Sequence, residues 1–409
     1  MSRIFILLGL MLSIDLYAYQ AFRLLWQNTA PIWRITGQVL YWLVPVVAIS
    51  YLGLALAGKT ESWSRALTTY VPAMIFILYI SKFLVVPALL IDDLRRGVQW
   101  VAGYFGNSVT TQAGRSRFLA QAGILLGSLP FVSLTYGMIR NPYRYQLFKR
   151  KIAVPDLPEK LDGLKIIQIS DIHSGSFTFR EPVQQAIDMI NAQEADLVFF
   201  TGDLVNDQAQ EMEPFKDMFA QIRSRYGVFS VLGNHDYGDY HNWPSTEAKK
   251  ENFQRLLDIH AEMGWRLLRN EHEKVAINGE EVAVIGVENY SAHPRFPKHG
   301  NLPQAYEGAE QSALKLLLSH DPSHWQYEVT KVFQDIALTF SGHTHGMQFG
   351  IEIPGYLKWS PIKYVYKQWA GLYQEGPQQL YVNRGLGFLG YPGRVGILPE
   401  ITCLELTRG

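Results

Sequence analysis

The residues best suited to chemistry are histidines, aspartates and an asparagine that follow short apolar runs in the second part of the chain. KIIQIS (165–170) leads into Asp171-Ile172-His173, LVFFT (197–201) into Gly202-Asp203, and VFSVLG (228–233) into Asn234-His235-Asp236. LKLLLS (314–319) ends in His320, and IALTFS (336–341) runs into Gly342-His343-Thr344-His345. Because loops that follow parallel strands converge at one edge of a sheet, we expect these side chains to meet there.

The residue types and their spacing indicate a metal site. In Asp171-x-His173 and His343-x-His345, the two side chains share one face if the segment is extended. Carboxylate, imidazole and amide oxygen together suit Mn, Fe, Zn or Ni better than Ca or Mg. One Asp-x-His pair alone is weak evidence, because such pairs are common on surfaces. Five groups in order, each after an apolar run, predict bound divalent ions, and Gly202, Gly233 and Gly342 would let the backbone approach them.

The elements that must position these residues alternate between strand and helix. Between the early apolar runs lie helical patterns at Pro182–Ala192 and Glu211–Arg225, and the later part of the chain is mostly strand, ending in ITCLEL (401–406). This order predicts an α/β domain with a sheet-rich second half.

The first part of the chain has a different character. Four apolar stretches, each near the ~20 residues that cross a bilayer, lie at Ile4–Leu25, Ile35–Leu56, Ala66–Ile91 and Phe118–Ile139. Buried helices of a soluble core are the alternative, but four such lengths exceed what a soluble core uses. We therefore predict a transmembrane domain over residues 1–140, a connector over 141–163 and a catalytic domain over 164–409.

Two ionisable side chains, Asp15 and Lys82, fall inside the predicted spans. An ionised group facing lipid costs several kcal/mol, so they either pair inside the bundle or reach to the headgroups near a helix end. The sequence leaves both arrangements open.

The basic residues after the last span favour a multi-pass membrane protein with its C-terminal domain in the cytoplasm. They include Arg140, Arg144 and Lys149–Lys151, which we expect to lie against lipid headgroups in a short tether. The loop before the fourth span is also basic, so this preference for the cytoplasm is small.

Composition excludes some classes of protein. With 37 basic and 37 acidic side chains, the 409-residue chain gives no electrostatic case for nucleic acid as a partner. The single cysteine, Cys403, permits neither an internal disulfide nor a cysteine metal cluster.

The order Asp-x-His, Gly-Asp, Gly-Asn-His-Asp, His and Gly-His-x-His resembles the calcineurin-like metallophosphoesterase superfamily. The strings at 169–175, 341–346, 383–387 and 399–402 are similar to its membrane-associated, YkuE-type branch. The resemblance covers about Leu161 to Leu406 and implies two packed β-sheets flanked by helices.

The resemblance also implies roles for individual residues. Asp171, His173 and His345 would hold one divalent ion, Asn234, His320 and His343 a second, and Asp203 would bridge the two. His235 would protonate the leaving group, positioned by Asp236. Two such ions about 4 Å apart can activate a hydroxide that attacks a phosphoryl group. One departure is Met347, which stands where the branch usually has a second glycine after Gly346.

Some residues outside the motifs allow two interpretations. Arg384 could bind a substrate phosphate or form a structural salt bridge. The aromatic and lysine-rich stretch from Tyr356 to Trp369 could pack against the domain or form a headgroup-level surface beside the metal cleft, with Trp359 and Trp369 towards the membrane. Histidines 241, 260, 272, 293, 299 and 324 are expected not to be ligands.

The leading hypothesis is a membrane-anchored, metal-dependent phosphoesterase that cleaves a phosphoester or pyrophosphate bond, in a lipid-linked or headgroup substrate. The resemblance makes UDP-diacylglucosamine pyrophosphatases of lipid A synthesis one candidate class. The alternatives are a nucleotide or general phosphodiesterase that is merely anchored to the membrane, and a non-catalytic metal-binding scaffold. A general acid such as His235 argues against the scaffold, because a structural metal site needs none.

Overall fold

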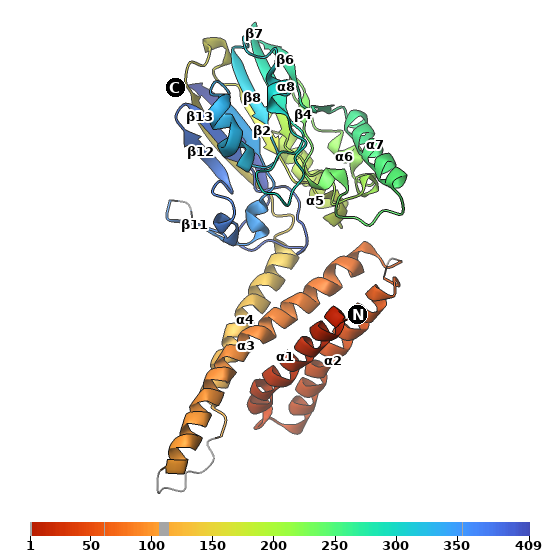
Figure 1. Ribbon diagram of the computed structural model, residues 1–409, viewed down its shortest axis with the longest axis vertical. Coiled ribbons are helices and arrows are strands. Elements are labelled where there is room, and N and C mark those ends of the chain that lie inside the picture. Colours follow the sequence, from red (N-terminus) through yellow and green to blue (C-terminus); the bar gives the residue numbers. More distant parts are fainter. Residues whose placement is uncertain (1, 61, 106–113, 354) are drawn as a thin grey trace. The chain divides into compact units, whose positions relative to one another are not determined.

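The computed structural model describes residues 2–60, 62–105, 114–353 and 355–409. The chain forms two compact units, Met1–Ile139 and Arg140–Gly409, which are considered separately below (Figure 1).

The first unit consists of long helices: α1 (Ser2–Trp26), α2 (Pro31–Leu56), α3 (Arg65–Phe105) and α4 (Arg117–Arg140). Each is long and apolar enough to cross a membrane, with a mean hydropathy between 1.6 and 2.4 in its most apolar window. The predicted four-helix membrane domain is thus confirmed. Helix α3 continues to Phe105, past the predicted end at Ile91, because ion pairs such as Arg95–Asp92 (2.9 Å) and Arg96–Asp93 (3.2 Å) stabilise its polar extension.

Helices α3 and α4 approach closely at two glycines spaced four apart. A Cβ at Gly127 would lie 2.5 Å from the carbonyl oxygen of Ser81, and one at Gly123 would lie 3.0 Å from Cβ of Ala88. Small residues at this spacing allow helices in a membrane to pack backbone to backbone.

Asp15 and Lys82 form an ion pair inside the helical unit, which decides between the two arrangements left open above. Nζ of Lys82 lies 2.6 Å from Oδ1 of Asp15, and both side chains are buried. The hydroxyl of Tyr79 donates to Oδ2 of Asp15 at 2.7 Å, and the lysine ammonium lies 4.3 Å from the centre of the Tyr41 ring. The pair therefore joins α1 to α3 without exposing either charge.

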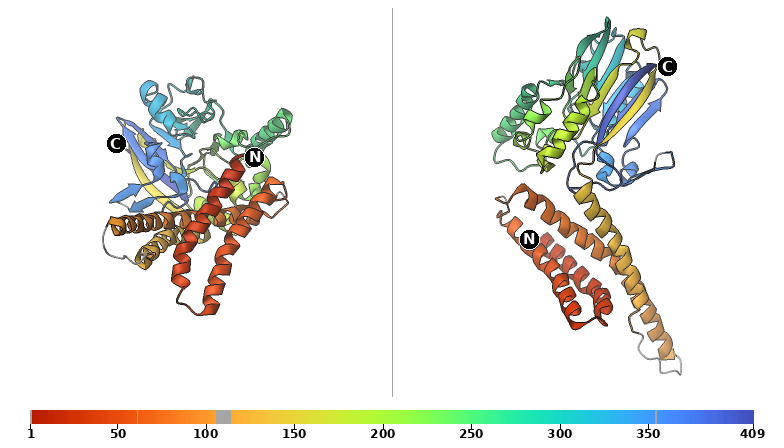
Figure 2. Two further views of the ribbon diagram at one scale, coloured as in Figure 1. Left: turned by 60° about the horizontal axis from the view of Figure 1, so that its bottom comes forward. Right: turned by 180° about the vertical axis from the view of Figure 1, so that it is seen from behind.

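The second unit contains two six-stranded sheets (Figures 1 and 2). The first sheet has the strand order β1 (Gln146–Val154), β14 (Glu400–Arg408), β2 (Lys165–Ile169), β3 (Leu197–Phe200), β4 (Val228–Ser230) and β5 (Arg266–Leu267). The second has the order β12 (Gly371–Glu375), β13 (Gln378–Val382), β9 (Leu338–Ser341), β8 (Leu314–Leu318), β7 (Glu280–Gly286) and β6 (Glu271–Ile277). A separate hairpin pairs β10 (Ile351–Ile353) with β11 (Leu357–Trp359).

The two sheets pack face to face around one core, as the contact of the Phe199 and Phe340 rings (4.8 Å between centroids) illustrates. A second core lies between the first sheet and helices α5 (Arg180–Asn191), α6 (Lys216–Phe219) and α7 (Thr246–Glu262). A third lies between the second sheet and the segments that contain α8 (Leu302–Tyr306) and α9 (Thr330–Val332). The expected fold of two packed sheets flanked by helices is confirmed, and burial on both faces explains why the strands read as continuous apolar runs.

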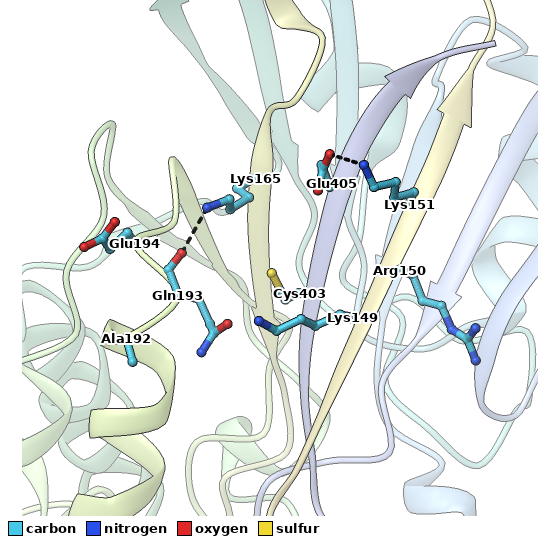
Figure 3. A pocket seen from close by; sticks show the side chains of 9 residues that line it. All are labelled: Lys149, Arg150, Lys151, Lys165, Ala192, Gln193, Glu194, Cys403 and Glu405. Carbon is cyan, nitrogen blue, oxygen red and sulfur yellow. Dashed lines mark hydrogen bonds and ion pairs between the residues drawn. The ribbon is translucent and has the colours of Figure 1, made fainter.

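The segment expected to be a connector, 141–163, is instead part of the domain. Its strand β1 pairs with β14 in parallel along nine residues, from Gln146–Glu400 to Val154–Arg408. Figure 3 shows Lys149 and Lys151 beside Cys403 and Glu405 of β14, and Lys151 pairs with Glu405 at 2.8 Å. Lys149–Lys151 are thus strand residues of the first sheet and do not belong to a flexible tether, so the structure corrects this boundary.

Candidate metal centre

The predicted ligand residues come together at one end of the two sheets. Asp171 and His173 follow β2, and Asp203 follows β3; both are parallel strands of the first sheet. His320 follows β8, and His343 and His345 follow β9, both in the second sheet. Because the parallel strands of each sheet end at the same edge, loops from both sheets meet across the top of the shared core.

Three side chains form a first candidate ligand group: Asp171, His173 and His345. Nε2 of His345 lies 3.2 Å from Oδ1 of Asp171 and 3.0 Å from Nε2 of His173. All three are buried, and their ligand atoms lie within 4.8 Å of one another.

A second candidate group consists of Asp203, His320 and His343. Nδ1 of His343 lies 3.2 Å from Nε2 of His320 and 2.8 Å from Oδ1 of Asn234, so the asparagine joins this group. Oδ2 of Asp203 lies 3.1 Å from His320 Nε2 and 3.5 Å from His173 Nε2. One carboxylate therefore contacts an imidazole of each group.

The hydrogen bonding around His320 fits a cation at this position. Its Nδ1 lies 2.7 Å from the carbonyl oxygen of Thr201, so Nδ1 carries the proton and Nε2 of the neutral ring is an acceptor. That acceptor faces the carboxylate of Asp203, which is an acceptor too. Although burial alone lowers the pKa of His320, the Asp203 carboxylate raises it to about 10. The buried groups therefore favour an extra positive charge between them, and the donor set is one that binds divalent transition metals.

Comparison with known proteins agrees with this geometry. The family described as "Probable Calcineurin-like phosphoesterase, transmembrane domain" matches residues 1–142, and the family described as "Calcineurin-like phosphoesterase" matches residues 164–347. An uncharacterized metallophosphoesterase of Helicobacter pylori strain J99 is 30% identical over 284 residues, which cover 68% of this chain and 70% of that protein. The chain belongs to the calcineurin-like phosphoesterase family.

Other members resemble it at similar levels. A transmembrane protein with metallophosphoesterase domain from Danio rerio is 29% identical over 286 residues, or 68% of this chain. The matched region spans 61% of that relative's length. The UDP-2,3-diacylglucosamine pyrophosphatase LpxG of Chlamydia trachomatis is 26% identical over 282 residues, which cover 57% of this chain and 81% of LpxG. The chain thus combines a calcineurin-like phosphoesterase domain with four helices long and apolar enough to cross a membrane.

The site of this phosphoesterase has an unusual backbone. Five of the proposed ligands have positive φ angles between 45° and 69°, a region that non-glycine residues seldom occupy: Asp171, His173, Asp203, His343 and His345. Such strain persists only where the surrounding structure enforces it, and it is concentrated at functional sites. No sequence pattern predicted this feature.

The glycines next to the ligands have the role that the sequence suggested. A Cβ at Gly233 would lie 2.2 Å from Oδ1 of Asp203, and one at Gly342 would lie 2.2 Å from Oδ2 of Asp171. No side chain fits at either position, so glycine is required for the ligand loops to pack together.

Met347 follows the same backbone rule despite its side chain. It has φ +56° and ψ +15°, which is the left-handed conformation that the glycine usual in this branch would adopt without strain. The backbone at Met347 is therefore in a conformation that glycine could adopt as well.

Three residues outside the predicted ligand set hold the ligands in place. The hydroxyl of Tyr366 lies 2.8 Å from Nε2 of His343 and donates to Oδ2 of Asp321 at 3.1 Å. The buried guanidinium of Arg394 donates to the carbonyl oxygens of Arg384 (2.9 Å) and Gly385 (3.0 Å), in the loop against His345. Asp321 adjoins His320 in the sequence and could have been suspected. Tyr366 and Arg394 reach the site only through the fold.

The position of His235 differs from the expectation in one respect. Its Nδ1 lies 2.7 Å from the carbonyl oxygen of Asn206, whereas the carboxylate of Asp236 is turned to backbone N–H groups. Asp236 is buried and accepts the backbone N–H groups of Asp203 (2.9 Å), Leu204 (2.8 Å) and Gly233 (2.8 Å). Burial, together with the nearby charge of Asp203, raises the pKa of Asp236 to about 7. Asp236 therefore fixes the two ligand loops, and Asn206 orients the His235 ring.

Arg384 forms the structural salt bridge that was one of its two interpretations. Its guanidinium is buried and paired with two carboxylates, Glu352 (2.6 Å) and Glu400. A contact of Arg384 with a substrate phosphate stays a prediction.

The aromatic stretch is partly buried against the domain and partly exposed. Trp369 is buried, and its carbonyl oxygen accepts a hydrogen bond from Oγ1 of Thr344 at 2.6 Å, so it supports the loop between His343 and His345. With Tyr366 it confirms that the stretch lines the metal site. The side chain of Trp369 lies in the domain interior and is not part of an exposed surface, and the expectation that Trp359 and Trp369 lie on the membrane side of the metals stays a prediction. Tyr356 and Tyr364 are exposed.

The histidines outside the motifs make other contacts. Nδ1 of His260 lies 3.1 Å from Oγ of Ser230 in the core, and His324 lies between Ser319 (2.8 Å) and Glu328 (3.0 Å).

Proposed function

We propose that this phosphoesterase holds two divalent ions, one at Asp171, His173 and His345 and one at Asn234, His320 and His343, with Asp203 shared between them. The observation that carries the proposal is the position of the Asp203 carboxylate, within 3.5 Å of an imidazole nitrogen of each group. Mn, Fe, Zn and Ni are the ions that suit this donor set. When bound, the ions would activate water as a nucleophile and neutralise charge on the phosphoryl oxygens.

His235 is the proposed general acid. With Nδ1 turned to the Asn206 carbonyl oxygen, Nε2 is the nitrogen available to donate a proton to a leaving oxygen. The backbone N–H of His235 donates to Oδ1 of Asp203 at 2.8 Å. This hydrogen bond fixes the position of His235 relative to the shared carboxylate. His235 is only partly buried, whereas its neighbour Asn234 is fully buried. Its imidazole is therefore accessible from outside the site, as contact with a substrate requires.

The substrate we infer is a lipid-linked or headgroup phosphoester or pyrophosphate. Two observations support this class: the chain carries four helices able to span a membrane, and its relative LpxG is named for a pyrophosphatase that acts on a diacylated sugar nucleotide. The alternative is a nucleotide phosphodiesterase anchored to the membrane. The assay described next distinguishes a lipid-linked substrate from a soluble nucleotide.

The test uses the full chain in lipid nanodiscs, stripped of metal and reloaded with Mn. Hydrolysis of a diacylated nucleotide–sugar pyrophosphate is compared with that of a soluble nucleotide and of bis(p-nitrophenyl) phosphate, with Asp203→Asn as the inactive control. We expect the highest kcat/KM for the lipid-linked compound. Equal or higher kcat/KM for the soluble nucleotide contradicts the lipid-linked substrate. Full activity in Asp203→Asn contradicts the two-ion site.

We also propose that the catalytic domain is cytoplasmic, because Arg140 and Arg144 follow the last span. A fluorescent reporter that matures only in the cytoplasm, fused after Gly409, is expected to fluoresce. A dark fusion, together with an active periplasmic phosphatase fusion at the same position, reverses the orientation.

A further inference from the structure

The hairpin of β10 and β11 and the turn after it expose a group of large apolar side chains. We call this group the hairpin face: Ile351, Ile353, Tyr356, Leu357, Tyr364 and Val365, each between 46% and 91% exposed. Ile353 pairs with Leu357 across the hairpin, and Ile351 lies two residues before Ile353 on the same side of β10. The apolar side chains are therefore grouped on one surface of the second unit.

The opposite side of the hairpin is fixed to the body of the domain. Glu352, which alternates with Ile351 and Ile353, accepts hydrogen bonds from Nε and Nη2 of Arg384 at 3.1 and 2.6 Å. Oγ of Ser360, just after β11, donates to the carbonyl oxygen of Gly346 at 2.8 Å. The hairpin is thus held with Glu352 inward, and this leaves Ile351 and Ile353 outward.

The base of the hairpin adjoins the point where the chain leaves its last apolar helix. Helix α4 ends at Arg140, and Nδ2 of the next residue, Asn141, donates to the carbonyl oxygen of Arg394 at 2.8 Å. The following residue, Val395, donates to the carbonyl oxygen of Gln348 (2.7 Å) and accepts from the N–H of Gly350 (2.9 Å). All these residues belong to the second unit. Arg394, which Asn141 contacts, and Val395, which pairs with the residues just before β10, are therefore neighbours in the chain.

We propose that the hairpin face inserts into the boundary between headgroups and acyl chains of the bilayer that holds α4. Exposed aliphatic residues mixed with tyrosine, and flanked by the exposed Lys363 and Lys367, have the composition of an interfacial surface. The domain cannot drift far from the bilayer, because Asn141 ties its surface to the residue that ends α4. A cavity of about 860 Å³ opens beside Ile353 and Leu357, and Phe148 and Leu398 continue its apolar lining.

Insertion would bring the lipid surface close to the metal site. Ser360 contacts Gly346, which follows His345, and Tyr366 of the same segment contacts His343. The apolar part of a lipid-linked substrate could therefore stay in the bilayer during hydrolysis. This consequence rests on the proposed function, but the insertion itself does not.

The direct test measures lipid contact in the full chain, reconstituted in nanodiscs with nitroxide-labelled lipids. An environment-sensitive fluorophore is attached to Tyr356→Cys and, as the matched control, to Val332→Cys, an apolar position that is 66% exposed on α9. The only native cysteine, Cys403, is buried, and labelling of the parent chain gives the background. We expect blue-shifted emission and several-fold quenching at position 356, with neither at 332.

Equal quenching at both positions overturns the proposal. A blue shift at 356 without quenching by lipid also overturns it, because the hairpin face is then covered by protein, such as a second copy of the chain.

A second test measures hydrolysis and needs no fluorescent label. Ile353→Asp and the control Val332→Asp are compared for hydrolysis of lipid-linked and soluble phosphoesters. A buried charge at the interface should lower kcat/KM for the lipid-linked compound about tenfold in Ile353→Asp alone, with the soluble compound unaffected. If no phosphoester is hydrolysed by the parent chain, the proposed function fails while the fluorescence result still decides on insertion.

Discussion

Oδ2 of Asp203 lies 3.1 Å from Nε2 of His320, and the proton on the other nitrogen of that ring is directed at a backbone carbonyl oxygen. In the neutral ring the two facing atoms would both be acceptors, so a cation between them is favoured. A divalent ion would supply that charge and leave the histidine neutral, which is the form that ligates metals.

Replacing Asp203 should remove both ions, because its carboxylate contacts both ligand groups. Outer-sphere partners of a metal already contribute about 10–100-fold in affinity or activity, so Asp203→Asn should lose more than that. The metal content measured by elemental analysis should fall from two ions per chain towards none. Asp217→Asn, which changes an exposed carboxylate paired with Arg180, is the control and should keep both. Retention of one full equivalent in Asp203→Asn would show that the carboxylate belongs to one ion only.

Replacing His235 should slow turnover and leave the metals in place. His235→Ala should cost about 10²–10⁴ in kcat for substrates with poor leaving groups, the usual weight of general acid catalysis. Esters of nitrophenol, whose leaving group needs no proton, should lose much less. The same deficit for both kinds of ester would remove the proposed role.

Removing the hydroxyl of Tyr366 should weaken the ion held by His343. Tyr366→Phe loses the contact at 2.8 Å to Nε2 of that histidine, and we expect a drop of about tenfold in metal affinity. Tyr364→Phe is the matched control, since Tyr364 is exposed and its ring lies near Lys363. Metal titration followed by calorimetry measures both. Unchanged affinity in Tyr366→Phe means that Asp321 alone orients the ring.

Breaking the ion pair in the helical unit should cost more than removing it. Lys82→Met leaves the Asp15 carboxylate buried without its cation, a change that destabilises by about 3–5 kcal/mol in buried pairs. Asp15→Asn with Lys82→Met should recover much of that loss, because neither charge remains. Thermal unfolding of the full chain in detergent gives the comparison. A double variant as unstable as the sum of the single ones would show that the two side chains act independently.

Met347→Gly should stabilise the second unit. A side chain in the left-handed region costs roughly 1–2 kcal/mol, and the greater freedom of glycine in the unfolded chain offsets part of this gain. Because Met347 is 55% exposed, few contacts are lost, and a net gain of about 0.5–1 kcal/mol is expected. Thermal unfolding measures it, and a lower midpoint would mean that the methionine makes contacts of its own.

The sequence predicted the ligand set because each ligand follows an apolar run, and the ends of parallel strands converge whatever the details of packing. The length of the apolar stretches predicted the four helices, and the resemblance to the family implied the two packed sheets. Strand β1 was missed, because its KRK segment lacks an apolar pattern and its partner lies some 250 positions away in β14. Pairing over such a separation leaves no local signal.

The contacts that orient the ligands were hidden for a similar reason. Tyr366 and Arg394 reach the site from loops, where spacing gives no direction, and the left-handed angles at Asp171 and His343 leave no signal in the residue types. For Asp15 and Lys82, the position inside predicted spans showed only that neither should face lipid. It could not show which faces of α1 and α3 meet.

Strand β14 lies between β1 and β2, so the first sheet has a gap at its second position until residue 408 has been synthesised. Strand β1 is made about 250 residues earlier, and during that interval its edge lacks this partner. At rates of roughly 5–20 residues per second, the delay amounts to tens of seconds. The first sheet therefore closes only after nearly all of the domain has been synthesised. During this period β1 exposes unpaired backbone groups, which are a template for pairing with other chains.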